Sequence, residues 1–275
     1  MKRSPLGTLA FAILVAGACG GGSRLALPEP RDEAVALRED IERILELTNV
    51  EGVLAARAPA FSRQTAILMG DPSDPELERL IPAVVDEFAY EKLYEDVVDF
   101  LMEEGAPELV AQTLEWMDGG ATAAVRRIGE EYAPAQTLEE YASELTDEPP
   151  SEDRIQLISA WAAARGEGDF FVLMQEALRE AANRVHQAMR PGAPSFEPLA
   201  GEELEVAQVN SHGAAVIRLL HGYTPAPDQL IRRATTERQS ESGQWFTQTY
   251  ALAVASAIRA AGQRAAERLS QSEAM

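Results

Sequence analysis

Apolar residues recur every three or four positions along most of the chain, the spacing that places them on one face of an α-helix. Residues 32–47 illustrate the pattern, with Ile41, Ile44 and Leu45 in one register. Alternating runs of β-branched and aromatic residues, which are typical of strands, are missing from the sequence. Ala, Leu, Glu, Arg and Gln dominate instead, and these residues favour helix. The sequence therefore predicts an all-α fold, a helical bundle or array.

The longest apolar stripe runs from Leu77 to Leu101 and ends at Gly105. Asp74 followed by Pro75 is a favourable helix start, and Pro82 is expected to kink or split this helix early. A short helix is expected after Thr137, because Thr137-Leu138-Glu139-Glu140 has the spacing of a capping box. Further helices are expected over residues 53–68, 107–117, 121–132, 155–161, 169–189, 202–220, 227–237 and 244–269.

The segment Asp147-Glu148-Pro149-Pro150-Ser151 is the strongest internal breaking signal. It predicts an acidic helical domain over residues 32–148 and a second helical domain over residues 151–270. The order of helices and breaks is similar in both, which favours the interpretation that the second domain is a repeat of the first. The alignment pairs Leu101 with Leu220, Leu109 with Leu230, and a turn at Gly120 with a turn at Gly243.

The N-terminus has the pattern of an export signal. Lys2 and Arg3 precede a short apolar run from Leu6 to Val15, which is shorter than the roughly 20 residues that span a bilayer. The next four residues, Ala16-Gly17-Ala18-Cys19, satisfy the small-x-small pattern of ordinary signal peptidase, which predicts cleavage after Ala18 and a signal peptide over residues 1–18.

The same four residues resemble the lipobox of bacterial lipoproteins. Cys19 is the only cysteine in the chain, so no internal disulfide is possible. The resemblance implies that Cys19 carries acyl chains and that Gly20 directs the protein to the outer membrane, facing the periplasm. Residues 19–31 then form the lipid-attachment cysteine and a flexible tether. The alternative is simple secretion with a chance thiol.

The chain is strongly acidic, with a formal net charge of -21 and a pI near 4.5. Nucleic acids and anionic lipid surfaces attract basic proteins, so this charge argues against both as direct partners. A basic protein partner is compatible with it, although acidic helix faces also serve solubility alone.

Candidate chemistry is sparse. Glu91, Glu95 and Glu103 share one helix side, but no facing Glu-x-x-His element accompanies them, so we expect no metal site. Ser211-His212 and Asp228 lack the nucleophile elbow of a hydrolase. Gly166-x-Gly168 lacks the strand that precedes a dinucleotide-binding loop and is interpreted as a turn between helices. The sequence predicts no catalytic residue and no cofactor.

Aromatic residues offer one further possibility. They either belong to the core or line a groove for a peptide or acyl chain between helices. The residues concerned are Trp116, Trp161, Trp245, Phe170, Phe171 and Phe246.

A second resemblance rests on a Leu-rich segment that leads through Leu114-Glu115-Trp116-Met117 to Gly119-Gly120 and a further helix. It resembles an uncharacterised family of small exported bacterial helical domains, over residues 34–132 and more faintly over 152–260. The resemblance implies fold and location only.

Two classes of function follow from the sequence. The favoured one is a membrane-tethered, non-enzymatic helical lipoprotein of the cell envelope that acts as an interaction or assembly accessory for a protein partner. The alternative is a periplasmic binding module for a lipid or small apolar ligand held between helices.

Overall fold

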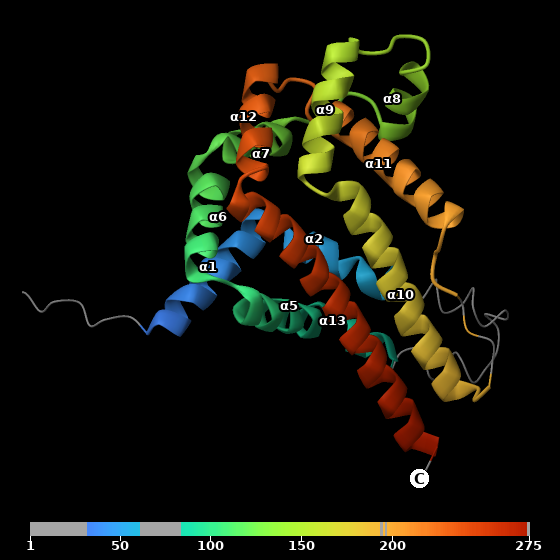
Figure 1. Cartoon of the computed structure of the whole chain (residues 1–275). Helices are drawn as coiled ribbons and strands as arrows, with labels where there is room; N and C mark the ends of the chain where they lie inside the picture. Colours follow the sequence, from blue (N-terminus) through green and yellow to red (C-terminus); the bar gives the residue numbers. More distant parts are fainter. Residues whose placement is uncertain (1–31, 61–83, 193–194, 196, 274–275) are drawn as a thin grey trace, which may run out of the picture. The chain divides into compact units, whose positions relative to one another are not determined.

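Every regular element in the described part of the computed structural model is a helix, as Figure 1 shows, and the all-α prediction is confirmed. The structure describes residues 32–60, 84–192, 195 and 197–273. Its elements are α1 (Glu33–Leu47), α2 (Val50–Ala55), the 3-10 helix η1 (Asp86–Phe88), α5 (Tyr90–Glu104), α6 (Pro107–Gly119), α7 (Ala121–Glu131), α8 (Leu138–Glu144), α9 (Glu152–Ala164), α10 (Glu167–Met189), α11 (Glu202–Gly222), α12 (Asp228–Arg238) and α13 (Glu241–Glu273). Within this part of the chain, no helix is both long and apolar enough to cross a membrane.

Helix starts follow local sequence signals closely. Thr137 and Glu140 form the predicted capping box at the start of α8. Ser151 caps α9 by accepting a hydrogen bond from the backbone N–H of Arg154. Gly166, at φ 62°, provides the left-handed residue between α9 and α10, which confirms the predicted turn there.

One expected helix differs from the structure. The sequence pattern predicts a helix from Asp74 to Gly105, of which residues 61–83 lie outside the described residues. The kink or split expected at Pro82 thus lies outside the described residues. Within the described part, the extended backbone of Ala89 (φ -59°, ψ 144°) separates η1 from α5, a break that the sequence pattern did not predict. The break lets Phe88 and Leu93 both reach the core, where they are 1% and 0% exposed.

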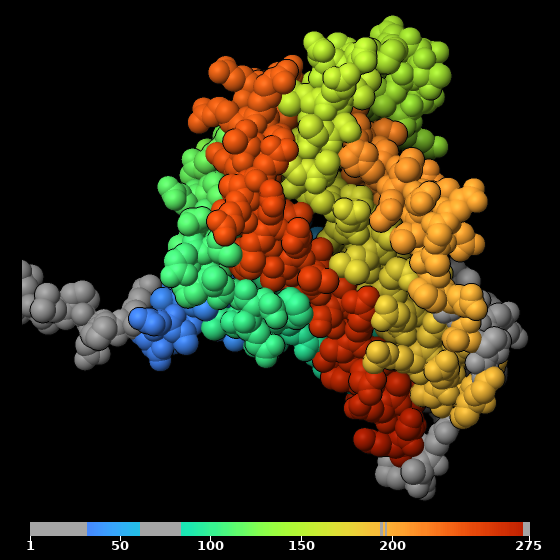
Figure 2. Space-filling model, in the orientation of Figure 1, coloured from blue at the N-terminus to red at the C-terminus, as the bar shows by residue number. Residues whose placement is uncertain are grey.

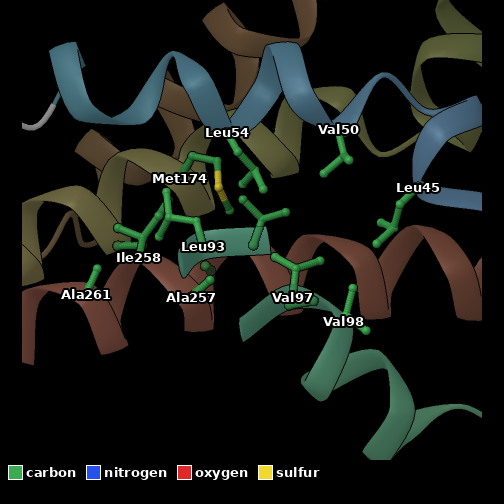
Figure 3. Close-up of a cluster of buried hydrophobic side chains, with 14 of the residues drawn as sticks. Leu45, Val50, Leu54, Leu93, Val97, Val98, Met174, Ala257, Ile258 and Ala261 are labelled. Atoms are coloured by element: carbon green, nitrogen blue, oxygen red, sulfur yellow. The ribbon is translucent and has the colours of Figure 1, made fainter. Parts of the chain in front are cut away.

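The larger hydrophobic core surrounds α13, which packs against α10 on one side and α5 on the other. Figure 3 shows how the side chains of this core converge from α1, α2, α5, α10 and α13. Gly262 of α13 lies directly against Ala181 of α10, since a Cβ on Gly262 would lie 2.5 Å from the Cβ of Ala181. The absence of a side chain at Gly262 therefore sets the close approach of the two longest helices.

A smaller core joins α7 to α9, α11 and α12 around the buried Trp161 and Ile158. Both cores thus combine helices from either side of Pro149 and Pro150, and the described residues from Glu33 onward belong to one compact unit. The segment 147–151 lies between α8 and α9 but does not separate two independent cores. Helices far apart in sequence pack together here, which a local breaking signal cannot reveal.

The helix pairs nevertheless recur in the same order in each half. Helix α1 packs on α5 and α6, as α9 packs on α11 and α12. Helix α2 packs on α5 as α10 packs on α11, and the contact of α7 with α12 corresponds to that of α13 with α6. This correspondence adds a structural argument for the predicted repeat. The proposed pairing of two glycine turns is wrong, because Gly120 precedes α7 whereas Gly243 lies inside α13.

Residues 1–31 lie outside the described residues. They include the predicted signal peptide (1–18), its cleavage site after Ala18, and the tether (19–31) with the lipid-attachment residue Cys19.

Candidate ligand-binding cavity

A cavity of about 670 Å³ lies where the turn between α1 and α2 meets α6, α7, α10, α11, α12 and the start of α13. Figure 2 shows a hollow on this side of the molecule between α13 and α10. Small-molecule sites in proteins typically enclose about 300–1,000 Å³. The cavity is therefore large enough for a small organic ligand.

Stacked aromatic rings form one wall of the cavity. The rings of Phe170 and Tyr250 are parallel within 2°, with centroids 5.8 Å apart. Phe246 also stacks on Tyr250, with ring centroids 5.4 Å apart. Burial raises the pKa of Tyr250 to about 12, so its hydroxyl stays neutral at any physiological pH. The wall presents flat apolar surface to an occupant.

Four arginines also line the cavity, namely Arg126, Arg165, Arg218 and Arg238. Three of them form ion pairs with carboxylates. Arg126 pairs with Glu130 at 2.9 Å, and Arg165 and Arg218 both pair with Glu167, at 2.6 Å and 3.4 Å. Burial opposes the charge of Arg165, but Glu167 and Tyr223 outweigh burial and leave the pKa of Arg165 raised. Each of these three arginines therefore has an ion-pair partner, although Arg165 and Arg218 share the single carboxylate of Glu167.

Arg238 differs from the other three. It is only 8% exposed, and its guanidinium lies over the ring of Trp116 at 4.7 Å and that of Phe246 at 5.6 Å. Its Nε is buried without a hydrogen-bond partner among the described residues, and no carboxylate oxygen of those residues lies within 4 Å of its guanidinium. Burial, with a smaller contribution from the charge of Arg165, lowers the pKa of Arg238 to about 9.

Glu237, the residue before Arg238, bonds the N-terminus of α7, where Thr122 lines the cavity. Its carboxylate accepts the backbone N–H groups of Ala121 and Thr122, each at 2.7 Å, and so caps the N-terminus of α7. Gly120 makes room for it, because a Cβ there would lie 2.7 Å from Oε1 of Glu237. Thr122 lines the cavity, and its side-chain hydroxyl is buried without a hydrogen-bond partner in the described part of the chain.

The ring of Tyr223 packs directly against Gly129 of α7. A Cβ on Gly129 would lie 2.4 Å from Cε1 of Tyr223, so the ring position depends on the missing side chain. The other side of the ring meets Trp161 edge-on, with centroids 4.8 Å apart. Packing therefore fixes Tyr223 as a rigid part of the cavity wall.

The aromatic residues singled out in the sequence divide between the two expected roles. Phe170, Phe171 and Phe246 line the cavity, and Trp116 lies behind Arg238. Trp161 belongs to the smaller core. Trp245 lies away from the cavity lining and donates from Nε1 to the carbonyl of Glu104 at 3.4 Å.

The other candidate groups do not come together. Ring atom Nε2 of His212 hydrogen-bonds Ser159 at 2.9 Å, whereas Asp228 pairs with Arg154. Glu95 pairs with Arg38 at 2.7 Å. No cluster of three or more potential metal-ligating side chains occurs in the part of the chain that the structure describes.

The arginines of the cavity were not identified from the sequence. Each lies on a different helix or turn, so no short motif connects them. Arg165, one turn after Trp161, and Arg238, two residues before Ser240, each lie at the C-terminal end of a helix. A cation at such a position commonly interacts only with the helix dipole, so neither arginine indicates a binding site by its sequence position.

The chain matches no protein-family model, and no curated protein and no solved structure shows significant similarity to it. Both resemblances seen in the sequence stay predictions.

Proposed function

We propose that this protein is a helical binding module of the bacterial cell envelope that holds a small organic ligand in the cavity beside α13. The observation that carries the proposal is a cavity of about 670 Å³ with a stacked aromatic wall and, among the described residues that line it, three buried polar atoms without a hydrogen-bond partner: Nε of Arg238 and the hydroxyls of Thr122 and Tyr250. Buried polar groups in native proteins are nearly always hydrogen-bonded, and exceptions often mark a site that an occupant completes.

The proposal keeps the export and lipid attachment predicted from the N-terminus. Acylation of Cys19 would hold the binding module at the membrane, since each buried CH₂ contributes about 0.8 kcal/mol and two or more chains anchor firmly. The ligand-binding class, which the sequence placed second, is preferred here because the cavity gives it a defined location. The interaction or assembly role with a protein partner stays a prediction.

Binding of N-phenyl-1-naphthylamine, a neutral aromatic probe that fluoresces in apolar surroundings, tests the proposal. The full chain carrying Cys19→Ala, made without lipid and purified without detergent, should bind the probe with saturation. Val53→Trp places an indole at the cavity wall and should abolish the signal, while the matched Val209→Trp, at a position 71% exposed, should leave it unchanged.

Thermal unfolding followed by circular dichroism shows whether each variant is folded. Saturable binding that Val53→Trp removes from a folded protein supports the proposal. No saturable binding, or equal binding by both tryptophan variants, would overturn it.

A further inference from the structure

We propose that the cavity selects an organic anion, with the guanidinium of Arg238 as its counter-charge and the hydroxyl of Thr122 as a second hydrogen-bonding group. This inference rests on the proposed binding function and names the chemical class of ligand. A carboxylate or sulfonate on an aromatic or other flat apolar body fits the combination of charge and stacked rings.

The charge of Arg238 is the first argument. Burying an ion without a partner costs several kcal/mol, so buried charges in proteins are nearly always paired. Arg238 is only 8% exposed, yet among the described residues its guanidinium contacts aromatic ring faces rather than a carboxylate. An anion in the cavity would supply the missing partner.

The surrounding charge is the second argument. The chain as a whole carries -21, and 45 acidic residues face 24 basic ones. In such an acidic chain a carboxylate partner for a buried arginine would be easy to supply. The neighbouring carboxylates, however, bond other groups. Glu167 holds Arg165 and Arg218, and Glu237 caps α7. Arg238 thus has no ion-pair partner among the described residues, and the more distant charges of Glu167 and Glu237 offset only part of the cost of its burial.

Thr122 provides the third argument. Thr122 and Arg238 both line the cavity, and Glu237, the residue before Arg238, bonds the backbone of Thr122. The hydroxyl is buried and unpartnered among the described residues, as are Nε of Arg238 and the hydroxyl of Tyr250 in the same cavity. An anion has several lone pairs and accepts from both donors at once, which a neutral alcohol or amine does less well.

The aromatic surroundings set the shape of the ligand. Phe246 contacts the guanidinium from one side and continues through Tyr250 to Phe170 as a stack. The charged group of the ligand would meet Arg238, and its ring system would lie along this stack.

A pair of probes that differ by one charged group tests the inference. 1-Anilinonaphthalene-8-sulfonate carries the naphthyl-phenyl amine skeleton of N-phenyl-1-naphthylamine with an added sulfonate. Fluorescence titration of the unlipidated full chain should show at least about tenfold tighter binding of the sulfonate, as expected for a desolvated charge-assisted contact. This comparison needs no substitution in the cavity.

Substitution of Arg238 then locates the charge. Arg238→Gln should weaken sulfonate binding by about tenfold or more and change the affinity for the neutral probe by less than about threefold. Arg238→Lys should retain part of the preference. The matched control is Arg184→Gln, which removes an arginine that bonds Gln263 outside the cavity and should change neither affinity.

The outcomes separate the two proposals. Preference for the sulfonate that depends on Arg238 supports both. Equal affinity for the two probes, or a preference that survives in folded Arg238→Gln, overturns the anion inference while leaving the binding function. Binding of neither probe overturns both. If Arg238→Gln does not fold, the wild-type preference and its retention in Arg238→Lys decide the question.

Discussion

Trp116 and Glu237 each bond the start of a helix from the opposite side of Pro149 and Pro150, and the predicted alignment of the two halves pairs them. The alignment that pairs Leu109 with Leu230 also pairs these two residues. Glu237 caps α7 by accepting from the backbone of Ala121, and Trp116 donates from Nε1 to Oγ of Ser242 near the start of α13 at 3.2 Å. This reciprocal arrangement links the halves and builds the corner of the cavity that contains Arg238.

Removing the charge of Glu237 should loosen α7. Glu237→Gln loses one of two carboxylate oxygens that accept N–H groups at 2.7 Å, and the free energy of unfolding should fall by about 1–2 kcal/mol. Urea denaturation measures it. The control Glu115→Gln, on the exposed face of α6, should stay within about 0.5 kcal/mol of the wild type. An equal effect of both variants would contradict the capping role.

The helices themselves were largely predictable from the sequence. Most of them begin and end within about one turn of their expected bounds, because periodic apolar residues, prolines and caps act locally. The capping box at Thr137 and the turn at Gly166 are examples. The break at Ala89 was not predictable, since the apolar pattern continues through Phe88 and Leu93 with no proline or glycine between them.

The cavity could not be predicted in the same way. Its walls come from helices that are distant in sequence, so its existence depends on how they pack. A sequence can suggest that Phe170 or Phe246 is buried, but not that a space remains between them. The unpaired state of Arg238 depends likewise on the engagement of Glu237 with α7, which is a contact over 116 positions.

Close packing of α10 and α13 gives a second prediction. Gly262→Ala places a Cβ 2.6 Å from Cα of Ala181, and it should lower the free energy of unfolding by about 1–3 kcal/mol although alanine favours helix. Gly213→Ala in α11 meets no atom within 4 Å and should raise it by up to about 1 kcal/mol. Chemical denaturation of both variants checks the opposite signs. Stabilisation by Gly262→Ala would show that the two helices are farther apart.

The affinity for an anion should depend on pH through Arg238. Its pKa of about 9 lies below that of an arginine in the unfolded chain, so the buried charge destabilises the folded protein at pH 7, and this cost is relieved as the pH rises above about 9. Deprotonation also removes the counter-charge for the ligand. Sulfonate binding should therefore weaken by about twofold between pH 7.5 and pH 9, as measured by titration.

The neutral probe provides the reference for this pH series. The sulfonate stays ionised throughout, and Tyr250, with a pKa raised to about 12, does not titrate in this range. A constant affinity for the sulfonate, or an equal change for both probes, would assign the pH dependence to another group.

Lipid attachment is tested at Cys19. The wild-type chain, made in a bacterial host with radiolabelled palmitate, should carry label and sediment with membranes. Cys19→Ala should carry none and move to the fraction without membranes, because it lacks the only acylation site that the lipobox resemblance implies. Membrane sedimentation unchanged by this substitution would contradict lipid anchoring and favour simple secretion with a chance thiol.

A crystal structure with 4-iodobenzoate tests the central claim most directly. The anomalous signal of iodine locates the ring, and the density locates the carboxylate. We expect the iodine beside the stack of Phe170, Tyr250 and Phe246, and a carboxylate oxygen within about 2.7–3.2 Å of the guanidinium of Arg238. An empty cavity at saturating ligand, or a carboxylate bound away from Arg238, would contradict the account.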